Sequence, residues 1–187
     1  MSPKKITGAL TLVIFLAHAG LAGAFFGIGK SGKVEVGSPA PEFSGTDLEK
    51  NLIQYSSYRG NSVVLLDFWS IYCASCVEEM PQLIEIYNDL KDQGLVVLGI
   101  NLDSFGTRRV IRFINGLEYT IPYPVIIDKK RTIAMAFNAM VLPTTIVIDA
   151  SGKIRMYHVG YKKGDEKEIR KVIESSLQKL KRAEKTK

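Results

Sequence analysis

Residues 67–76 read Asp67-Phe68-Trp69-Ser70-Ile71-Tyr72-Cys73-Ala74-Ser75-Cys76, and they contain the only two cysteines of the 187-residue chain. A bond between cysteines at this spacing closes a very short loop. Because the stabilisation that a disulfide gives through chain entropy grows with loop length, such a bond adds little to folding. The pair is therefore expected to serve chemistry, and the chemistry of two neighbouring thiols is reversible thiol–disulfide exchange.

This stretch joins a predicted strand to a predicted helix. Residues 63–68 form a continuous apolar run apart from Asp67, which is typical of a strand buried on both faces. Between Cys76 and Leu90 apolar residues recur at helical spacing, and Pro81 is expected to kink that helix. Cys73 then lies at a helix N-terminus, where the dipole and unpaired N–H groups favour the thiolate. We predict that Cys73 attacks the substrate and that Cys76 resolves the mixed disulfide.

Strand and helix signals alternate along the rest of the chain. The predicted strands are residues 95–102, 125–127, 144–148 and 154–159, and the predicted helices lie around residues 110–117, 131–137 and 169–180. Residues 43–58 predict a short hairpin or an irregular cap, and residues 149–152 a hairpin turn. This order predicts an α/β fold, with a central mixed β-sheet flanked by helices. The length suits one domain of ordinary size.

The N-terminal residues predict export. Lys4 and Lys5 precede an apolar run, and Ala22-Gly23-Ala24 is a cleavage pattern, which indicates a signal peptide over residues 1–24 and a linker over 25–35. The alternative is an uncleaved membrane anchor formed by residues 6–28, because apolarity continues to Ile28. Both interpretations place the domain outside the cytoplasm, in a periplasmic or equivalent compartment where disulfides persist.

The net charge of +6 is concentrated at the two ends of the chain. Residues 181–187 form a predicted basic tail, and the body between the ends is close to neutral. The tail is interpreted as a solubilising end, with contact to anionic lipid or to an acidic partner as the alternative. Nothing in this distribution indicates nucleic-acid binding.

Three motifs together resemble the thioredoxin superfamily, and specifically its exported ResA/TlpA-like branch. The tract from Asp67 to Cys76 is similar to the strand-to-site segment of thioredoxins, and Glu79-Met80-Pro81 to the acidic residue and proline of this branch. Leu142-Pro143-Thr144-Thr145 is similar to the cis-proline loop. The resemblance covers residues 36–180. It implies a thioredoxin-like fold whose redox centre is a Cys73–Cys76 disulfide without any further cofactor.

The resemblance also implies a substrate-binding loop. A cis bond before Pro143 would place the backbone of Leu142 beside Cys73, so Leu142, Pro143 and Thr144 are the predicted substrate-binding residues. Without the resemblance, Pro143 is an ordinary trans proline in a turn. Tyr72 stands where thioredoxins usually carry tryptophan, so the partner surface is expected to differ.

Three further residues are implied to support the thiols. Asp67 matches the buried aspartate that assists proton transfer from the resolving thiol, Glu79 matches a glutamate lining the active-site cavity, and Trp69 is expected to pack beside the site. The alternatives are a solvated carboxylate at the strand end, a surface charge on the helix, and a tryptophan that serves only the core. Carboxylates close to the thiols would oppose thiolate formation.

These features predict an extracytoplasmic thiol–disulfide oxidoreductase. The Ala74-Ser75 spacer contains no histidine to stabilise a thiolate, which favours a reductant. The resemblance implies protein disulfide substrates, among them the C-x-x-C-H motif of apocytochromes c, and a membrane thiol-reductant donor. The alternative is an adaptor or metallochaperone that holds Cu(I) through the two thiols. No zinc site is expected, because one C-x-x-C motif supplies only two of four ligands.

Overall fold

The computed structural model describes residues 33–186, which contain a five-stranded mixed sheet. Its order is β5-β4-β3-β6-β7, with β3 parallel to β4, β4 parallel to β5, and β6 antiparallel to both β3 and β7. The strands are β3 (Val63–Trp69), β4 (Leu95–Asn101), β5 (Val125–Ile127), β6 (Thr144–Ile148) and β7 (Ile154–Val159). All seven residues of β3 are buried, as the apolar run predicts for a central strand.

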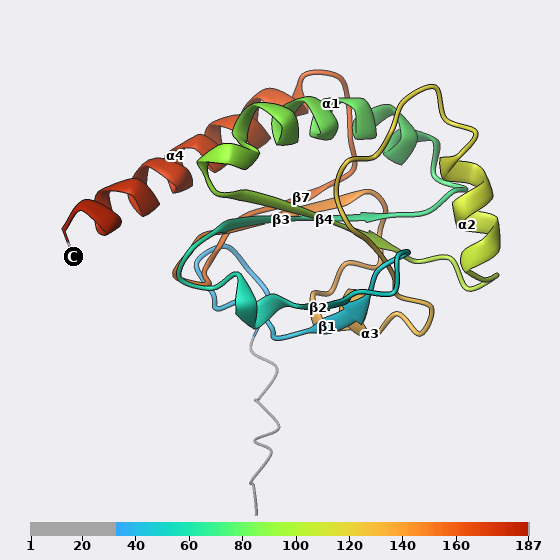
Figure 1. Cartoon of the computed structure of the whole chain (residues 1–187), viewed down its shortest axis with the longest axis horizontal. Helices are drawn as coiled ribbons and strands as arrows, with labels where there is room; N and C mark the ends of the chain where they lie inside the picture. Colours follow the sequence, from blue (N-terminus) through green and yellow to red (C-terminus); the bar gives the residue numbers. More distant parts are fainter. Residues whose placement is uncertain (1–32, 187) are drawn as a thin grey trace, which may run out of the picture. The chain divides into compact units, whose positions relative to one another are not determined.

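Helices and a small hairpin cover the two faces of this sheet (Figure 1). Helices α1 (Ala74–Leu90) and α4 (Asp165–Lys185) lie on one face. On the other face are α3 (Thr132–Ala136) and the antiparallel pair β1 (Ser44–Thr46) and β2 (Leu52–Gln54). Helix α2 (Thr107–Ile114) follows β4, and two 3₁₀ turns occur at Tyr55–Ser57 and Lys91–Gln93. The predicted α/β fold class is confirmed.

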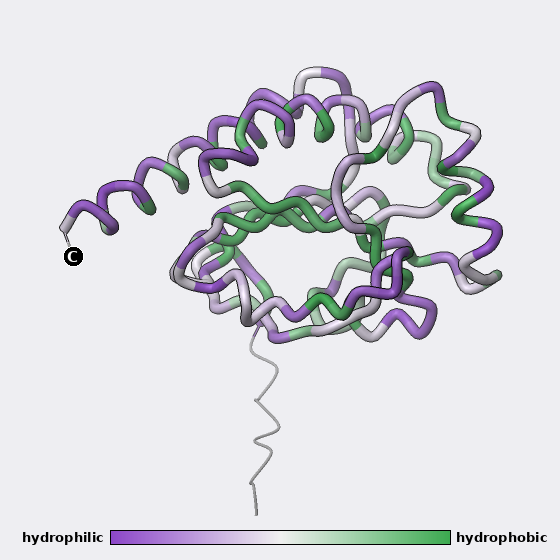
Figure 2. Tube along the Cα trace, viewed as in Figure 1, coloured by the Kyte–Doolittle hydropathy of each residue, from purple (hydrophilic) through white to green (hydrophobic). Residues whose placement is uncertain are grey.

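Alternation along β3 creates two apolar layers, one on each face of the sheet, and the central strands are green, the colour of hydrophobic residues, in Figure 2. Successive side chains of a strand point to opposite faces. Val64, Leu66 and Phe68 pack with residues of β2 and α3, whereas Val63 and Leu65 pack with residues of α1 and α4. Asp67 and Trp69 lie on the same face of β3 as Val63 and Leu65. Their side chains therefore point towards α1.

Helices α2 and α4 end at other residues than the sequence predicts. Helix α2 ends at Ile114, and Leu117 lies beyond it. Helix α4 continues to Lys185, so most of the predicted basic tail is helical.

The predicted signal peptide, the alternative anchor and most of the predicted linker lie outside the described residues. Within residues 33–186, no helix combines the length and the apolarity needed to cross a bilayer.

Candidate active site

The two cysteines form a disulfide at the start of α1. The sulfur atoms of Cys73 and Cys76 are 2.05 Å apart and the Cα atoms 5.2 Å apart. Cys73 is the N-cap of the helix and is half-buried, whereas Cys76 is only 1% exposed. Cys73 is therefore the more accessible of the two cysteines, and its role as the attacking thiol stays a prediction.

Polar groups around Cys73 are arranged to stabilise negative charge on its sulfur. The backbone N–H of Cys76 donates to Cys73 Sγ at 3.2 Å, and Ser75 Oγ lies 3.6 Å from the same sulfur. A donor at a helix N-terminus favours a thiolate over a thiol. In the reduced protein, this geometry suits Cys73 to attack the disulfide of another protein.

The loop between β3 and α1 is held by a buried aspartate that sequence reasoning missed. Asp103 Oδ1 accepts from Ser70 Oγ at 2.6 Å, and Oδ2 accepts from the Ile71 N–H at 3.0 Å and from Asn101 Nδ2 at 2.7 Å. Ser70 Oγ in turn accepts from the Tyr72 N–H at 3.2 Å. The available signal was the position of Asp103 just beyond the C-terminal end of a parallel strand, where α/β proteins gather functional groups.

An Asp103→Ala variant is expected to lose about 2–3 kcal/mol of unfolding free energy, because three donors lose their acceptor. Urea denaturation of the oxidised protein measures this loss. Ser104→Ala, at the exposed neighbouring position, is the matched control and should change stability by less than about 0.5 kcal/mol. Equal stability of the two variants would show that Asp103 does not hold the loop.

The predicted substrate-binding loop lies at the disulfide. The Leu142–Pro143 peptide bond is cis, as the resemblance implies, and it precedes β6. Leu142 and Cys73 both pack against the apolar cluster that contains Cys76. Thr144 is buried and its hydroxyl donates to the Val141 carbonyl at 2.6 Å. The side chain of Leu142 thus lies in the same apolar surroundings as the two cysteines, and substrate binding by this loop stays a prediction.

Trp69 is buried in the same cluster, where it packs with Cys76 and Met80. Its ring lies 6.2 Å from that of Phe113 on α2, centroid to centroid. A Cβ at position 99 would lie only 3.2 Å from Trp69 Nε1, so Gly99 leaves the space that the indole occupies. Trp69 therefore belongs both to the core and to the surroundings of the resolving cysteine.

The two candidate carboxylates are buried together between β3 and α1. Asp67 is directly opposite Thr145 in the β3–β6 ladder, so the two side chains share one face of the sheet. Thr145 Oγ1 donates to Glu79 Oε1 at 2.8 Å, which brings the second carboxyl to the same place. Asp67 is 2% and Glu79 1% exposed. The alternatives of a solvated strand-end carboxylate and a surface helix charge are therefore wrong.

Burial changes the protonation of both groups. Desolvation, together with the nearby charge of Glu79, holds the pKa of Asp67 well above its usual range. Desolvation, supported by the charge of Asp165 and opposed by the hydrogen bond from Thr145, raises the pKa of Glu79 to about 7. Near neutral pH, Glu79 therefore exchanges a proton easily, which the proton transfers of thiol–disulfide exchange require.

Sequence reasoning did not identify Tyr123 as part of this buried polar group. Burial and the charges of Asp67 and Glu79 raise its pKa well above the usual range. Within residues 33–186, its hydroxyl and Glu79 Oε2 are buried side-chain atoms without a hydrogen-bond partner. A tyrosine in an apolar strand-like segment gives no local signal of this role, because its polar neighbours come from β3 and α1.

The described residues contain no cluster of three or more His, Cys, Asp or Glu side chains placed to hold a metal ion. His158, on β7, is 3.0 Å from Asp165 through its Nε2 atom. The candidate site comprises the Cys73–Cys76 disulfide, the loop held by Asp103, the cis-proline loop at Pro143 and the buried carboxyl groups.

Comparisons with known proteins agree with this arrangement. Residues 36–157 match the AhpC/TSA family. ResA, a thiol-disulfide oxidoreductase of Bacillus cereus (strain ATCC 10987 / NRS 248), is 33% identical over 154 residues, which cover 81% of this chain and 87% of the relative. ResA of Geobacillus kaustophilus (strain HTA426) is 35% identical over 127 residues, covering 68% and 71%.

Solved structures give the same result. A Chlorobium tepidum protein assigned as the thiol:disulfide interchange protein DsbE has a TM-score of 0.71 and 26% identity, covering 77% of this chain and 99% of that protein. The thioredoxin domain of a thiol-disulfide oxidoreductase from Bacteroides vulgatus has a TM-score of 0.64 and 26% identity, covering 74% and 98%. The chain therefore belongs to the AhpC/TSA family, as a thiol–disulfide oxidoreductase of the ResA and DsbE type with a thioredoxin-like fold.

Proposed function

We propose that this oxidoreductase works as a reductant of protein disulfides outside the cytoplasm. The observation that carries the proposal is the burial of Glu79, one helical turn after Cys76, together with Asp67. Because the pKa of Glu79 is about 7, part of the molecules carry negative charge there at neutral pH, and this charge disfavours a nearby thiolate and so destabilises the reduced protein relative to the disulfide. The Ala74-Ser75 spacer adds no cation that would act in the opposite direction.

The reaction has two exchange steps. The Cys73 thiolate attacks a substrate disulfide, forms a mixed disulfide and expels one substrate thiolate, which takes a proton. The Cys76 thiol then loses its proton to the Asp67–Glu79 pair and attacks Cys73 Sγ. The Cys73–Cys76 bond forms, the second substrate thiolate leaves, and two electrons have passed to the substrate. A membrane thiol-reductant donor returns the pair to the dithiol.

The predicted signal peptide over residues 1–24, or the anchor over residues 6–28, supports an extracytoplasmic location. The resemblance to the ResA/TlpA-like branch supports the oxidised C-x-x-C-H motif of apocytochromes c as a substrate. The proposal therefore includes an extracytoplasmic location, apocytochrome c as a substrate and a membrane thiol-reductant donor.

Equilibration with glutathione mixtures, followed by thiol alkylation, measures the direction of exchange. We expect a reduction potential closer to the value of thioredoxin, about −270 mV, than to that of DsbA, about −120 mV. A disulfide-bonded C-x-x-C-H peptide should be reduced by the dithiol protein. A potential near the DsbA value would reverse the proposed direction. Absence of turnover, together with retention of Cu(I), would favour the metallochaperone alternative.

A further inference from the structure

Two aromatic side chains are exposed next to the reactive sulfur. Tyr72, which directly precedes Cys73, is 64% exposed, and Phe105, in the loop between β4 and α2, is 71% exposed. Their rings meet edge to face with centroids 6.3 Å apart. A single exposed apolar residue is ordinary on a protein surface, whereas neighbouring exposed aromatic rings indicate a site that binds a partner.

An arginine fixes these rings in place. Arg109 Nη1 donates to the Tyr72 hydroxyl at 2.7 Å, and the guanidinium carbon lies 5.3 Å from the centroid of the Phe105 ring. The buried Asp103 holds the loop that carries Tyr72, through the N–H of Ile71. Tyr72, Phe105 and Arg109, which we call the platform, therefore keep a defined arrangement before a partner arrives, which lowers the entropy cost of binding.

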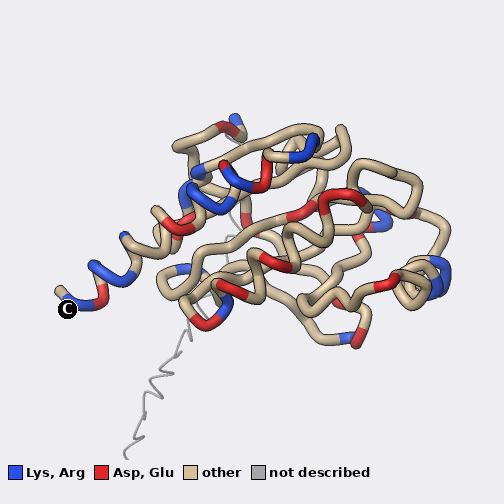
Figure 3. Tube along the Cα trace, turned by 90° about the horizontal axis from the view of Figure 1, so that it is seen from above, with Lys and Arg blue, Asp and Glu red and all other residues tan. Residues whose placement is uncertain are grey.

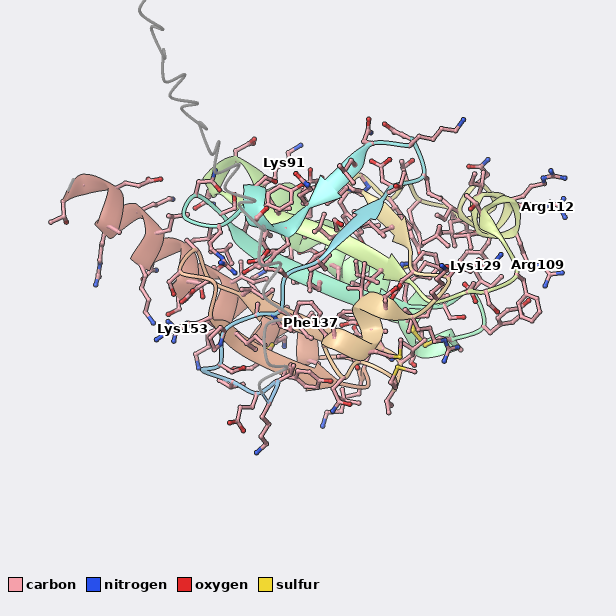
Figure 4. All side chains as sticks on the ribbon, turned by 90° about the horizontal axis from the view of Figure 1, so that it is seen from below. Lys91, Arg109, Arg112, Lys129, Phe137 and Lys153 are labelled. Carbon is pink, nitrogen blue, oxygen red and sulfur yellow. A yellow bond between two sulfur atoms is a disulfide. The ribbon has the colours of Figure 1, made fainter. Side chains whose placement is uncertain are left out.

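The platform continues into unpaired positive charge on α2. Arg108, Arg109 and Arg112 are all exposed, and no ion pair among residues 33–186 involves any of them. Figure 3 shows the blue residues gathered on this helix, and in Figure 4 Arg109 and Arg112 point away from the body. A guanidinium group has five N–H donors, and Arg109 uses only one of its own on Tyr72.

We propose that the platform and Arg112 bind an acidic segment that flanks the disulfide in a protein substrate. This inference rests on the proposed function and narrows its substrate class. Arginine pairs with carboxylates in a directional, bidentate manner, and aromatic rings next to it cover the apolar part of the same segment. Because Tyr72 adjoins Cys73, a segment bound there lies beside the attacking sulfur. This adjacency favours a disulfide-containing polypeptide over an anionic membrane.

Two disulfide peptides of equal length test the proposal, one with Asp and Glu beside the cysteines and the other with Lys. At low ionic strength, wild-type protein should reduce the acidic peptide about tenfold faster in kcat/KM. The double variant Arg109→Gln/Arg112→Gln should lower this ratio to about two. The matched control is Lys91→Gln/Lys153→Gln, which removes the same charge at positions away from α2 and should keep the ratio near ten (Figure 4).

Salt provides a measurement that needs no substitution. Raising the ionic strength to about 1 M shortens the screening length to about 3 Å, and the wild-type ratio should fall towards one. Equal rates for both peptides at low salt, or the same ratio in both double variants, would overturn the inference. Reduction of neither peptide would instead count against the proposed function. The inference would also be overturned if the double arginine variant lost binding to phosphatidylglycerol vesicles but still reduced the acidic peptide about ten times faster than the Lys peptide. That result would assign the surface to membrane binding.

Discussion

A Cys76→Ser variant is expected to accumulate as a covalent complex with its substrate. Cys73 still attacks, but the second exchange step has no attacking thiol, so the mixed disulfide persists. Turnover should fall by at least about a thousandfold, because a nucleophile of the reaction is removed. Non-reducing electrophoresis and mass spectrometry of the protein incubated with a disulfide substrate detect the complex.

Cys73→Ser is the matched control for this result. It retains the buried thiol of Cys76, which is only 1% exposed, and should form no complex with a folded protein substrate. The reverse outcome, with a complex formed by Cys73→Ser and none by Cys76→Ser, would show that the roles of the two cysteines are exchanged.

A Glu79→Gln variant is expected to remove a large pH-dependent component of stability. The ordinary glutamate pKa of 4.5 applies to the unfolded chain, whereas burial raises the pKa of Glu79 in the folded protein to about 7. The unfolded chain therefore releases this proton first as the pH rises. The stability associated with the protonated carboxyl is complete below about pH 4.5 and is lost through about pH 7. The shift corresponds to about 3 kcal/mol.

Unfolding free energies of the oxidised protein, measured from about pH 4.5 to pH 8, test this expectation. The difference between wild type and Glu79→Gln should change by about 3 kcal/mol across this interval in favour of the glutamine variant at the higher pH. Glutamine can still accept the hydrogen bond from Thr145 through its carbonyl oxygen. Glu78→Gln, at the exposed neighbouring position, is the control and should show no such change. Parallel profiles for wild type and Glu79→Gln would contradict the burial of an ionisable carboxyl at this position.

Local patterns predicted the framework of the site. The buried strand β3, the cysteine pair at the start of α1 and the β6–β7 hairpin each follow from a few adjacent residues. Hydrophobic periodicity and turn composition act over this range, so the sequence is informative about them. The cis-proline loop followed from its resemblance to a known motif rather than from periodicity.

The remaining features depend on contacts between residues far apart in the chain. Glu79 and its neighbour Glu78 look alike in the sequence, yet only Glu79 is buried, because it lies on the face of α1 that packs on the sheet, where Thr145, 66 positions away, donates to it. The interaction between Asp103 and Ser70, 33 positions apart, likewise needs the parallel pairing of β3 and β4 before it exists. Such partners are set by tertiary structure, which overrides the surface position that polarity alone predicts.

The central place of β3 in the sheet divides the site into parts of unequal mobility. This strand has a hydrogen-bonded neighbour on each side and no exposed residue, so separating it from the sheet requires opening the domain as a whole. Asp67 and Trp69 are accordingly expected to become exposed only when the whole domain opens. The loops that carry Tyr72 and Phe105 lie at the surface and are held by Arg109 and Asp103 rather than by the sheet. Opening of these loops at the rim of the site therefore does not require the domain to unfold, whereas exposure of its proton-exchanging interior does.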